Sequence, residues 1–152
     1  MGESTLSLED FLPYRLNRLA DAMSRDFSRL YRERFGMTRP EWRLLATLGQ
    51  YGTMTATAIG QHSSMHKTKV SRAVTALEQR RWLARRPDEA DRRIEHLTLT
   101  KAGTDAYLQL VPVAHSFEEV LFARMGARDR KTVLAGLAAL EQALPNLKNL
   151  ER

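Results

Sequence analysis

A short stretch near the middle of the chain is crowded with side chains that could bind a nucleic acid. They are Lys67, Thr68, Lys69, Ser71 and Arg72. Lysine and arginine can donate hydrogen bonds to guanine O6 and N7, and serine or threonine can contact a base or a phosphate. On an isolated helix, such a basic face is more often simply solvated. Whether these residues form an interface therefore depends on the elements that position them.

The spacing of apolar residues places this stretch on an amphipathic helix. Val70, Val74 and Leu77 recur at i, i+4 and i+7, so they share one face that can pack on a neighbouring helix. The basic and hydroxyl residues begin at the N-terminal end of the other face. A recognition helix presents its N-terminal residues to base edges in the major groove in this way, and the positive end of its dipole favours phosphate.

The residues after this helix predict a two-stranded hairpin with a charged tip. Residues 82–86 and 94–99 have the composition of short strands, and the second alternates leucine with polar residues. The turn-rich segment 87–91 lies between them and is followed by Arg92 and Arg93. Two strands around such a tip form a wing, and an arginine there suits the narrow, electronegative minor groove.

The predicted interface joins the helix, the turn before it and the tip of the wing. Asp91 is close enough in sequence to pair with Arg93 and to hold its guanidinium in one orientation. The alternative is an ordinary surface hairpin that carries a surface ion pair. The full set of predicted DNA-contacting residues is Ser64, His66, Lys67, Thr68, Lys69, Ser71, Arg72, Asp91, Arg92 and Arg93.

The net charge is concentrated in the same region. Residues 66–101 hold ten Lys/Arg and five Asp/Glu, so they carry +5 of the chain's net charge of +6. A concentrated basic patch favours an anionic polymer as the partner more strongly than a diffuse charge does. The chain has 152 residues and 43% hydrophobic content, enough for one domain with a core, which excludes a disordered chain.

The elements before the basic stretch are predicted to be helical. Apolar residues at 3- and 4-residue steps predict one long helix over 8–34, with Pro13 in its second turn as a bend or a late start. Thr38 begins a capping box for a second helix. Thr55 caps a short third helix, and residues 61–65 form the turn into the basic helix.

Two further helices are predicted after the wing. Thr100 caps the first, which Pro112 should kink without ending, and Gly126 breaks the apolar stripe. The last helix is predicted over 128–143 and is stopped by Pro145. Its inward residues are predicted to be Val133, Leu134, Leu137, Leu140 and Leu144.

The two ends of the chain are thus apolar and helical, whereas the middle is basic. We expect a single domain over 1–152, in which 38–100 form a winged helix-turn-helix. The terminal helices, 8–34 and 101–144, are expected to join two chains into a homodimer. Two-fold symmetry would then place two recognition helices and two wings on a palindromic DNA site.

The combined pattern resembles the MarR family of bacterial transcriptional regulators. The resemblance rests on HSSMHKTKVSRAVTALEQRRWLARR, DEADRR and LTLTKAG, and it covers about residues 44–103. It implies a mainly α-helical fold with a small β-hairpin wing, a dimer and a repressor released by a small molecule. Two positions depart from the family pattern. Ser64 stands where a turn glycine is frequent, and His66 stands where an acidic cap is frequent and is a poorer N-cap than Asp or Asn.

The opening LEDFLPYRLNRLAD and the helix MHKTKVSRAV resemble a branch of this family that responds to hydroxycinnamates or other aromatic acids, some of them coenzyme A thioesters. The resemblance implies an effector between the terminal helices and the winged domain. Arginines could face its carboxylate or phosphate beside aromatic side chains, although each is at least as well explained as core or solvated surface. The candidate effector residues are Phe11, Tyr14, Arg15, Arg18, Trp42 and Arg43.

Other chemistry finds little support in the sequence. The chain has no cysteine, which excludes disulfides and a thiol redox sensor, and it has no nucleophile, phosphate-loop or zincin motif. His62 and His66 straddle the predicted turn without a nearby carboxylate, so we expect no metal, no cofactor and no enzyme activity. No targeting or membrane-length segment is apparent, and a soluble cytoplasmic protein is expected. The remaining alternative is a winged-helix module that binds RNA or protein without responding to a ligand.

Overall fold

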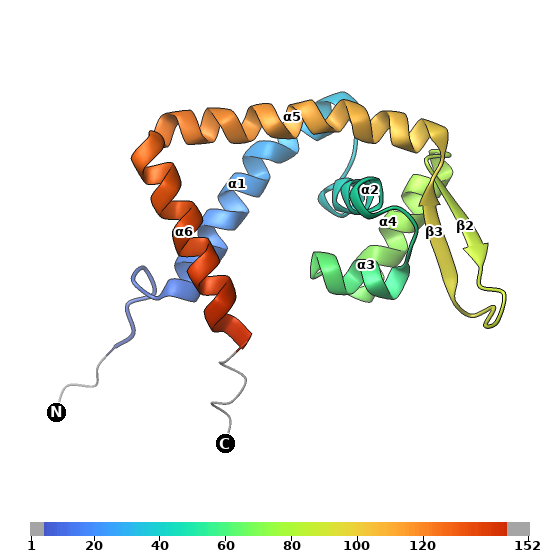
Figure 1. Cartoon of the computed structure of the whole chain (residues 1–152), viewed down its shortest axis with the longest axis horizontal. Coiled ribbons are helices and arrows are strands. Elements are labelled where there is room, and N and C mark those ends of the chain that lie inside the picture. Colours follow the sequence, from blue (N-terminus) through green and yellow to red (C-terminus); the bar gives the residue numbers. More distant parts are fainter. Residues whose placement is uncertain (1–4, 146–152) are drawn as a thin grey trace, which may run out of the picture. The chain divides into compact units, whose positions relative to one another are not determined.

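The computed structural model describes residues 5–145, which form six helices and three short strands (Figure 1). The mainly helical fold with a small antiparallel sheet confirms the predicted class. The chain divides into two compact units within the fifth helix, one ending at Val113 and the other beginning at Ala114. The elements are α1 (Leu12–Phe35), α2 (Arg39–Tyr51), β1 (Met54–Thr55), α3 (Ala56–Ser63), α4 (Lys67–Gln79), β2 (Leu83–Pro87), β3 (Glu95–Leu99), α5 (Lys101–Met125) and α6 (Ala127–Ala143).

Helix α1 begins later than the apolar spacing predicted. Pro13 lies in its first turn, where the missing N–H of proline has no helical partner to lose. The residues before it form a separate turn, in which the Phe11 N–H donates to the Ser7 carbonyl at 3.1 Å. The late start predicted as one role of Pro13 is therefore the one observed. The helix ends at Gly36, whose φ of +62° is left-handed and favours glycine.

The core of the first unit lies where α2, α3 and α4 pack together. Leu44, Leu45 and Ile59 are fully buried, and Leu77 of α4 joins them. The expected caps are present at the helix starts. The Thr38 N–H donates to Glu41 Oε2 at 2.9 Å at the start of α2, and Thr55 accepts from the Ala58 N–H at 3.2 Å at the start of α3.

The wing belongs to a three-stranded antiparallel sheet in the order β1-β3-β2. Leu83 pairs with Leu99 and Arg85 with Leu97 in the hairpin. The third strand was not predicted, because Met54 and Thr55 are too few to show an alternation and their pairing partners lie about forty residues away in β3. This strand holds the base of the hairpin against the segment that leads into α3.

Helix α5 continues through Pro112, as expected. Its first turn lies so close to the chain before β2 that a Cβ at Gly103 would be 2.0 Å from the Trp82 carbonyl oxygen. Ala106, Leu110 and Val113 are buried in the first unit. None of the helices between residues 5 and 145 is both long and apolar enough to cross a membrane.

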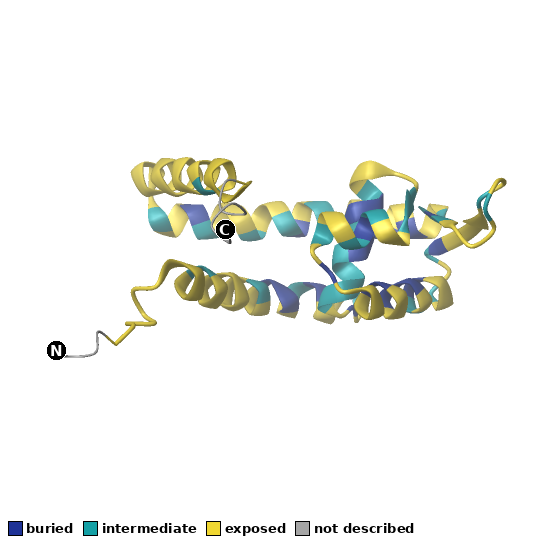
Figure 2. Cartoon of the chain, turned by 90° about the horizontal axis from the view of Figure 1, so that it is seen from below, coloured by how far each residue is buried: buried dark blue, intermediate teal, exposed yellow. Residues whose placement is uncertain are grey.

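The second unit contains the end of α5 and helix α6. The Arg130 guanidinium lies 4.4 Å from the centre of the Phe122 ring and 3.6 Å from Glu119 Oε1, which joins the two helices. Within Ala127–Ala143 no residue is buried, and Figure 2 shows α6 as almost entirely exposed.

The inward face predicted for α6 is therefore wrong for a single chain. Val133, Leu134, Leu137 and Leu144 are 40–58% exposed, and Leu140 is half-buried. Their 3- and 4-residue spacing does give them a common face. A face is buried only where another surface covers it, however, and spacing does not indicate which chain supplies that surface.

Candidate nucleic-acid interface

The turn before α4 is shorter than predicted, because α3 continues to Ser63. Ser64 then takes a left-handed conformation, with φ of +53° and ψ of +35°, and is exposed. This conformation explains why a glycine suits the position, since glycine adopts positive φ without steric cost. The reversal between the two helices is thus completed in the three residues 64–66.

His66 caps the N-terminus of α4. Its Nδ1 accepts a hydrogen bond from the Thr68 N–H at 3.3 Å, which is long for a bond of this kind. The bond requires a neutral imidazole whose proton is on the other ring nitrogen. The cap predicted to be poor is therefore present, but its hydrogen bond is long. It lies at the N-terminus of α4, the helix that carries the basic residues.

Helix α4 divides into a buried and an exposed face, as the apolar spacing predicted. Val70, Val74 and Leu77 are at most 3% exposed and pack against α2 and α3. The residues predicted to contact DNA lie on the exposed face: Lys67, Thr68, Lys69, Ser71 and Arg72. Their donors are available to a partner over the first turn and a half of the helix.

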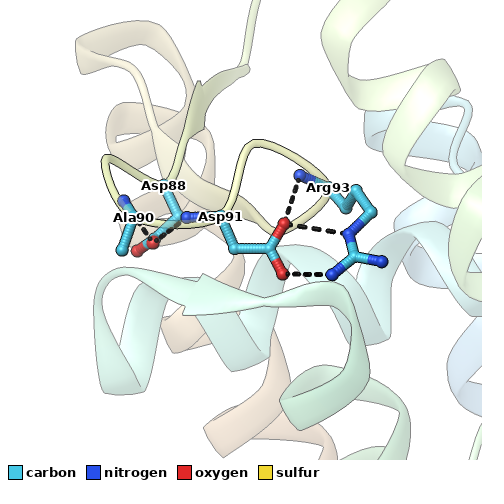
Figure 3. A network of polar contacts seen from close by, with 4 residues as sticks. All are labelled: Asp88, Ala90, Asp91 and Arg93. Carbon is cyan, nitrogen blue, oxygen red and sulfur yellow. Dashed lines mark hydrogen bonds and ion pairs between the residues drawn. The ribbon is translucent and has the colours of Figure 1, made fainter.

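The tip of the wing is held by two aspartates (Figure 3). The Asp88 carboxylate accepts from the backbone N–H groups of Ala90 and Asp91, each at 3.0 Å. His96 Nε2 lies 2.8 Å from Asp88 Oδ1 on the strand side. These hydrogen bonds, that of His96 first, hold the pKa of Asp88 below its ordinary value.

The predicted pairing of Asp91 with Arg93 is confirmed. Both oxygens of the Asp91 carboxylate bond to the guanidinium, and Oδ1 also accepts from the Arg93 backbone N–H at 3.0 Å. The hydrogen bonds from Arg93 lower the pKa of Asp91, while that carboxylate raises the pKa of Arg93. The Arg93 side chain is nevertheless 90% exposed, and Arg92 is exposed beside it.

Arg85 connects the wing to the end of α4. Its Nε donates to Glu78 Oε2 at 2.6 Å, and its Nη1 donates to Glu95 Oε2 at 3.1 Å. These two hydrogen bonds raise the pKa of Arg85. A cleft of about 620 Å³ lies beside this bridge, lined by α3, α4 and the sheet, including His66 and Ser71. The basic face of α4 and the wing therefore border one concave surface.

The six candidate effector residues fall into two separate groups. Phe11, Tyr14, Arg15 and Arg18 lie at the exposed start of α1, where the Arg18 guanidinium is 5.9 Å from the centre of the Tyr14 ring. Trp42 and Arg43 lie on α2, beside the distant half of α1. Trp42 lies against Tyr31 of α1. Since a helix rises about 1.5 Å per residue, Arg15 and Tyr31 are about 24 Å apart along α1. One chain therefore does not bring the six candidate residues together.

The structure adds Tyr31, which the sequence analysis missed, to the second group. Its ring lies 5.3 Å from Phe27 and 5.8 Å from Trp42, between centroids. Tyr31 is fully buried, and its hydroxyl has no well-formed hydrogen bond to any residue that the structure describes. The i, i+4 spacing from Phe27 could have placed Tyr31 on the packed face, but nothing in the sequence reveals its unpaired hydroxyl.

The charges around Tyr31 favour an acceptor or an anion. Burial raises the pKa of Tyr31, and the cations of Arg32, Arg39 and Arg43, followed by a side-chain contact with Ser28, oppose this shift without cancelling it. Burial also lowers the pKa of Arg43, whose Nη1 makes a long 3.5 Å contact with the Ser63 carbonyl. A partly desolvated guanidinium and a phenol without a well-formed hydrogen bond could together bind a carboxylate.

Comparison with known proteins identifies the family. A family model described as the MarR family matches residues 37–94. The uncharacterized HTH-type transcriptional regulator YwoH of Bacillus subtilis is 30% identical over 99 residues, which cover 65% of this chain and 72% of that protein. The chain belongs to the MarR family. This MarR protein is accordingly a DNA-binding transcriptional regulator.

Solved structures of other bacterial proteins share its fold. A MarR family regulator from Silicibacter pomeroyi DSS-3 is similar with a TM-score of 0.74 at 27% identity, over 90% of this chain and 98% of that one. The structure that describes regulation of DNA binding of Bordetella bronchiseptica BpsR by 6-hydroxynicotinic acid gives a TM-score of 0.77 at 20% identity, over 91% of this chain and 98% of that one.

Among residues 5–145, no group of three or more His, Cys, Asp or Glu side chains could hold a metal ion.

Proposed function

We propose that this MarR protein is a dimeric repressor that binds a palindromic operator and is released by a small aromatic acid or its coenzyme A thioester. The observation that carries the proposal is the exposed basic face of α4 beside an arginine-tipped wing. The exposed donors of α4 suit the base edges of the major groove, whereas Arg92 and Arg93 suit the minor groove. Asp91 contributes by orienting Arg93.

Dimerisation is supported by apolar side chains that one chain leaves uncovered. On α1, Leu12 and Leu19 are 49% and 57% exposed, and on α6 Leu134 and Leu137 are 47% and 45% exposed. A soluble domain rarely exposes such surface unless a partner covers it. In this proposal the segments 8–34 and 101–144 join two chains, and 38–100 of each chain binds one half-site.

The effector proposal rests on the group around Tyr31. Its aromatic neighbours Phe27 and Trp42 suit an aromatic ring, while the Tyr31 hydroxyl and the Arg43 guanidinium suit a carboxylate. The related fold of BpsR, whose DNA binding is regulated by 6-hydroxynicotinic acid, supports an aromatic acid as the class. Such an acid would act by binding more tightly to a dimer whose recognition helices are misplaced for the operator.

The proposal is tested by selecting bound fragments from the source genome and measuring affinity for the recovered duplex. We expect the recovered sequence to be palindromic and sedimentation to show one dimer bound to each duplex. The logarithm of the binding constant should fall steeply and linearly with the logarithm of the salt concentration. A panel of aromatic acids and thioesters should contain compounds that raise the melting temperature and weaken DNA binding. A monomer in solution, or binding to RNA in preference to every duplex, would contradict it.

A further inference from the structure

Arg80, directly after the last residue of α4, binds the end of α1. Its Nη1 donates to the Phe35 carbonyl at 2.5 Å, and its Nη2 donates to the Gly36 carbonyl at 2.8 Å. The last carbonyls of a helix lack helical partners and carry the negative end of its dipole. The guanidinium therefore satisfies two acceptors at the C-terminus of α1 although it is 44 residues distant in sequence.

The same guanidinium reaches the start of α2. Arg80 Nη2 lies 3.8 Å from Glu41 Oε2, and the Glu41 side chain is only 13% exposed. That Glu41 oxygen also accepts the Thr38 N–H at the N-terminus of α2. One pair of charges thus holds the end of one helix and the start of the next.

Trp82 extends the contact to the wing and to α5. The Arg80 guanidinium lies 5.0 Å from the centre of the Trp82 ring, whose edge-on neighbour is Phe35 at 6.3 Å. The Trp82 carbonyl accepts the Thr100 N–H at 2.9 Å, and it lies against the first turn of α5 at Gly103. Arg80 thus contacts the end of α1, the start of α2 and the Trp82 ring directly, and the Trp82 backbone continues the contact to α5.

We propose that Arg80 is a positioning residue, which fixes the C-terminal end of the recognition helix to α1 directly and to α5 through Trp82, and so sets the separation of the two recognition helices in the dimer. This inference rests on the proposed dimeric DNA-binding function. The most extensive contacts of α4 are with α2, α3 and β2, all inside the winged helix. Arg80 instead links α4 to the helices that would join the two chains.

Arginine is required for this role by its geometry. A planar guanidinium presents its donors in a fixed fork, so it can serve two carbonyls and a carboxylate while stacking on an indole. A lysine ammonium keeps the charge but is a compact point charge on a flexible stem. Arg80→Lys should therefore retain part of the link, and Arg80→Gln should lose most of it.

The test compares palindromic duplexes, obtained by selection from random sequence, in which the half-sites stand at the selected spacing or are moved apart by one or two base pairs. For Arg80→Gln we expect affinity for the selected spacing to fall about tenfold, the effect of losing hydrogen bonds to a charged group. Affinity for the shifted spacings should fall less, so the spacing preference flattens. The spacing preference of Arg80→Lys should lie between those of the wild-type protein and Arg80→Gln. In both variants the base preference within a half-site should stay unchanged.

Arg81→Gln provides the matched control, because it removes the same charge one residue away, and it should keep the wild-type spacing preference. Circular dichroism and sedimentation establish which variants are folded and dimeric. If a folded, dimeric Arg80→Gln or Arg80→Lys protein loses affinity equally at every spacing, or loses none, the proposal is overturned. If Arg80→Gln does not fold, the Arg80→Lys profile decides. Failure of the wild-type protein to bind any palindromic duplex would overturn the proposed function itself.

Discussion

The guanidinium of Arg93 forms a two-point ion pair with the carboxylate of Asp91, with Nε 3.0 Å from Oδ1 and Nη2 3.1 Å from Oδ2. The pair leaves the Arg93 side chain 90% exposed, so the fork is oriented without being covered. An exposed ion pair of this kind contributes little to folding. Its role is better understood as setting the direction of one cation at the wing tip.

Replacing Arg93 with alanine should weaken binding to many DNA sequences alike. A wing arginine is attracted mainly by the negative potential of the phosphates and of a narrow minor groove, which many sequences share. The slope of the logarithm of the binding constant against the logarithm of the salt concentration should decrease by about one when this cationic contact is lost. The melting temperature of the protein should stay at the wild-type value. Asp91→Asn keeps the arginine but frees its fork and should give a smaller loss. Affinity equal to wild type in Arg93→Ala would place the wing outside the interface.

Replacing Lys69 with alanine should change which sequence is preferred. A lysine on the exposed face of α4 can discriminate between bases by about 1–3 kcal/mol where it reaches a base edge. Selection from random duplexes should therefore give a relaxed position in each half-site. The control is Lys131→Ala on α6, which removes one exposed charge and should leave the selected sequence unchanged. An unaltered sequence from Lys69→Ala would contradict the placement of this residue.

Replacing Ser64 with glycine should stabilise the protein. Its φ of +53° is strained for a residue with a Cβ, and glycine relieves that strain at some cost in unfolded-chain entropy, for a net gain of roughly 0.5 kcal/mol. Thermal unfolding should show a small rise in melting temperature. Thr57→Gly, in the first turn of α3, is a control in which glycine should instead lower stability, by roughly 0.3 kcal/mol. A lower melting temperature for Ser64→Gly would argue against the left-handed turn.

The carboxyl group of Asp88 should titrate below its ordinary value of 3.8. Because its folded-state pKa is depressed, its contribution to wing stability is fully present above that value and is lost as pH falls through the lower folded pKa. Carbon-13 NMR of the carboxyl group measures this directly. In His96→Ala the pKa should rise toward the ordinary value, since the largest cause of the shift is removed. An unchanged titration in that variant would mean that the backbone N–H bonds alone set the pKa.

Replacing Tyr31 with phenylalanine should separate stability from effector response. Removing a buried hydroxyl that lacks a well-formed hydrogen bond relieves a penalty of about 1 kcal/mol, so the free protein should melt at a higher temperature. The response of DNA binding to aromatic acids should weaken. Tyr14→Phe, at the exposed start of α1, should change neither stability nor response. If Tyr31→Phe destabilises the free protein, the hydroxyl has a partner and the effector proposal loses its main support.

The sequence was informative where one short stretch specifies its own geometry. The buried and exposed faces of α4 follow from a spacing of 3 and 4 residues, and the pairing of Asp91 with Arg93 follows from two positions in one turn. The sequence could also place caps at Thr38 and Thr55, because a cap satisfies backbone groups within its own first turn.

Features that depend on distant partners could not be predicted. Strand β1 exists only because Met54 and Thr55 pair with Leu97 and His96 of β3. The contact of Arg80 with Phe35 joins residues 45 positions apart. The buried hydroxyl of Tyr31 depends on packing between α1 and α2. The apolar face of α6 was predicted correctly as a face, but spacing alone could not say that one chain leaves it uncovered.

Thr55 belongs to two elements at once, since it pairs with His96 in the sheet and caps α3 with its hydroxyl. A displacement of the hairpin would therefore also displace the start of α3. We therefore expect the base of the wing to move together with the helix-turn-helix when the protein binds the double helix. Little freedom is left for binding to remove, which favours a tighter complex for the same set of contacts.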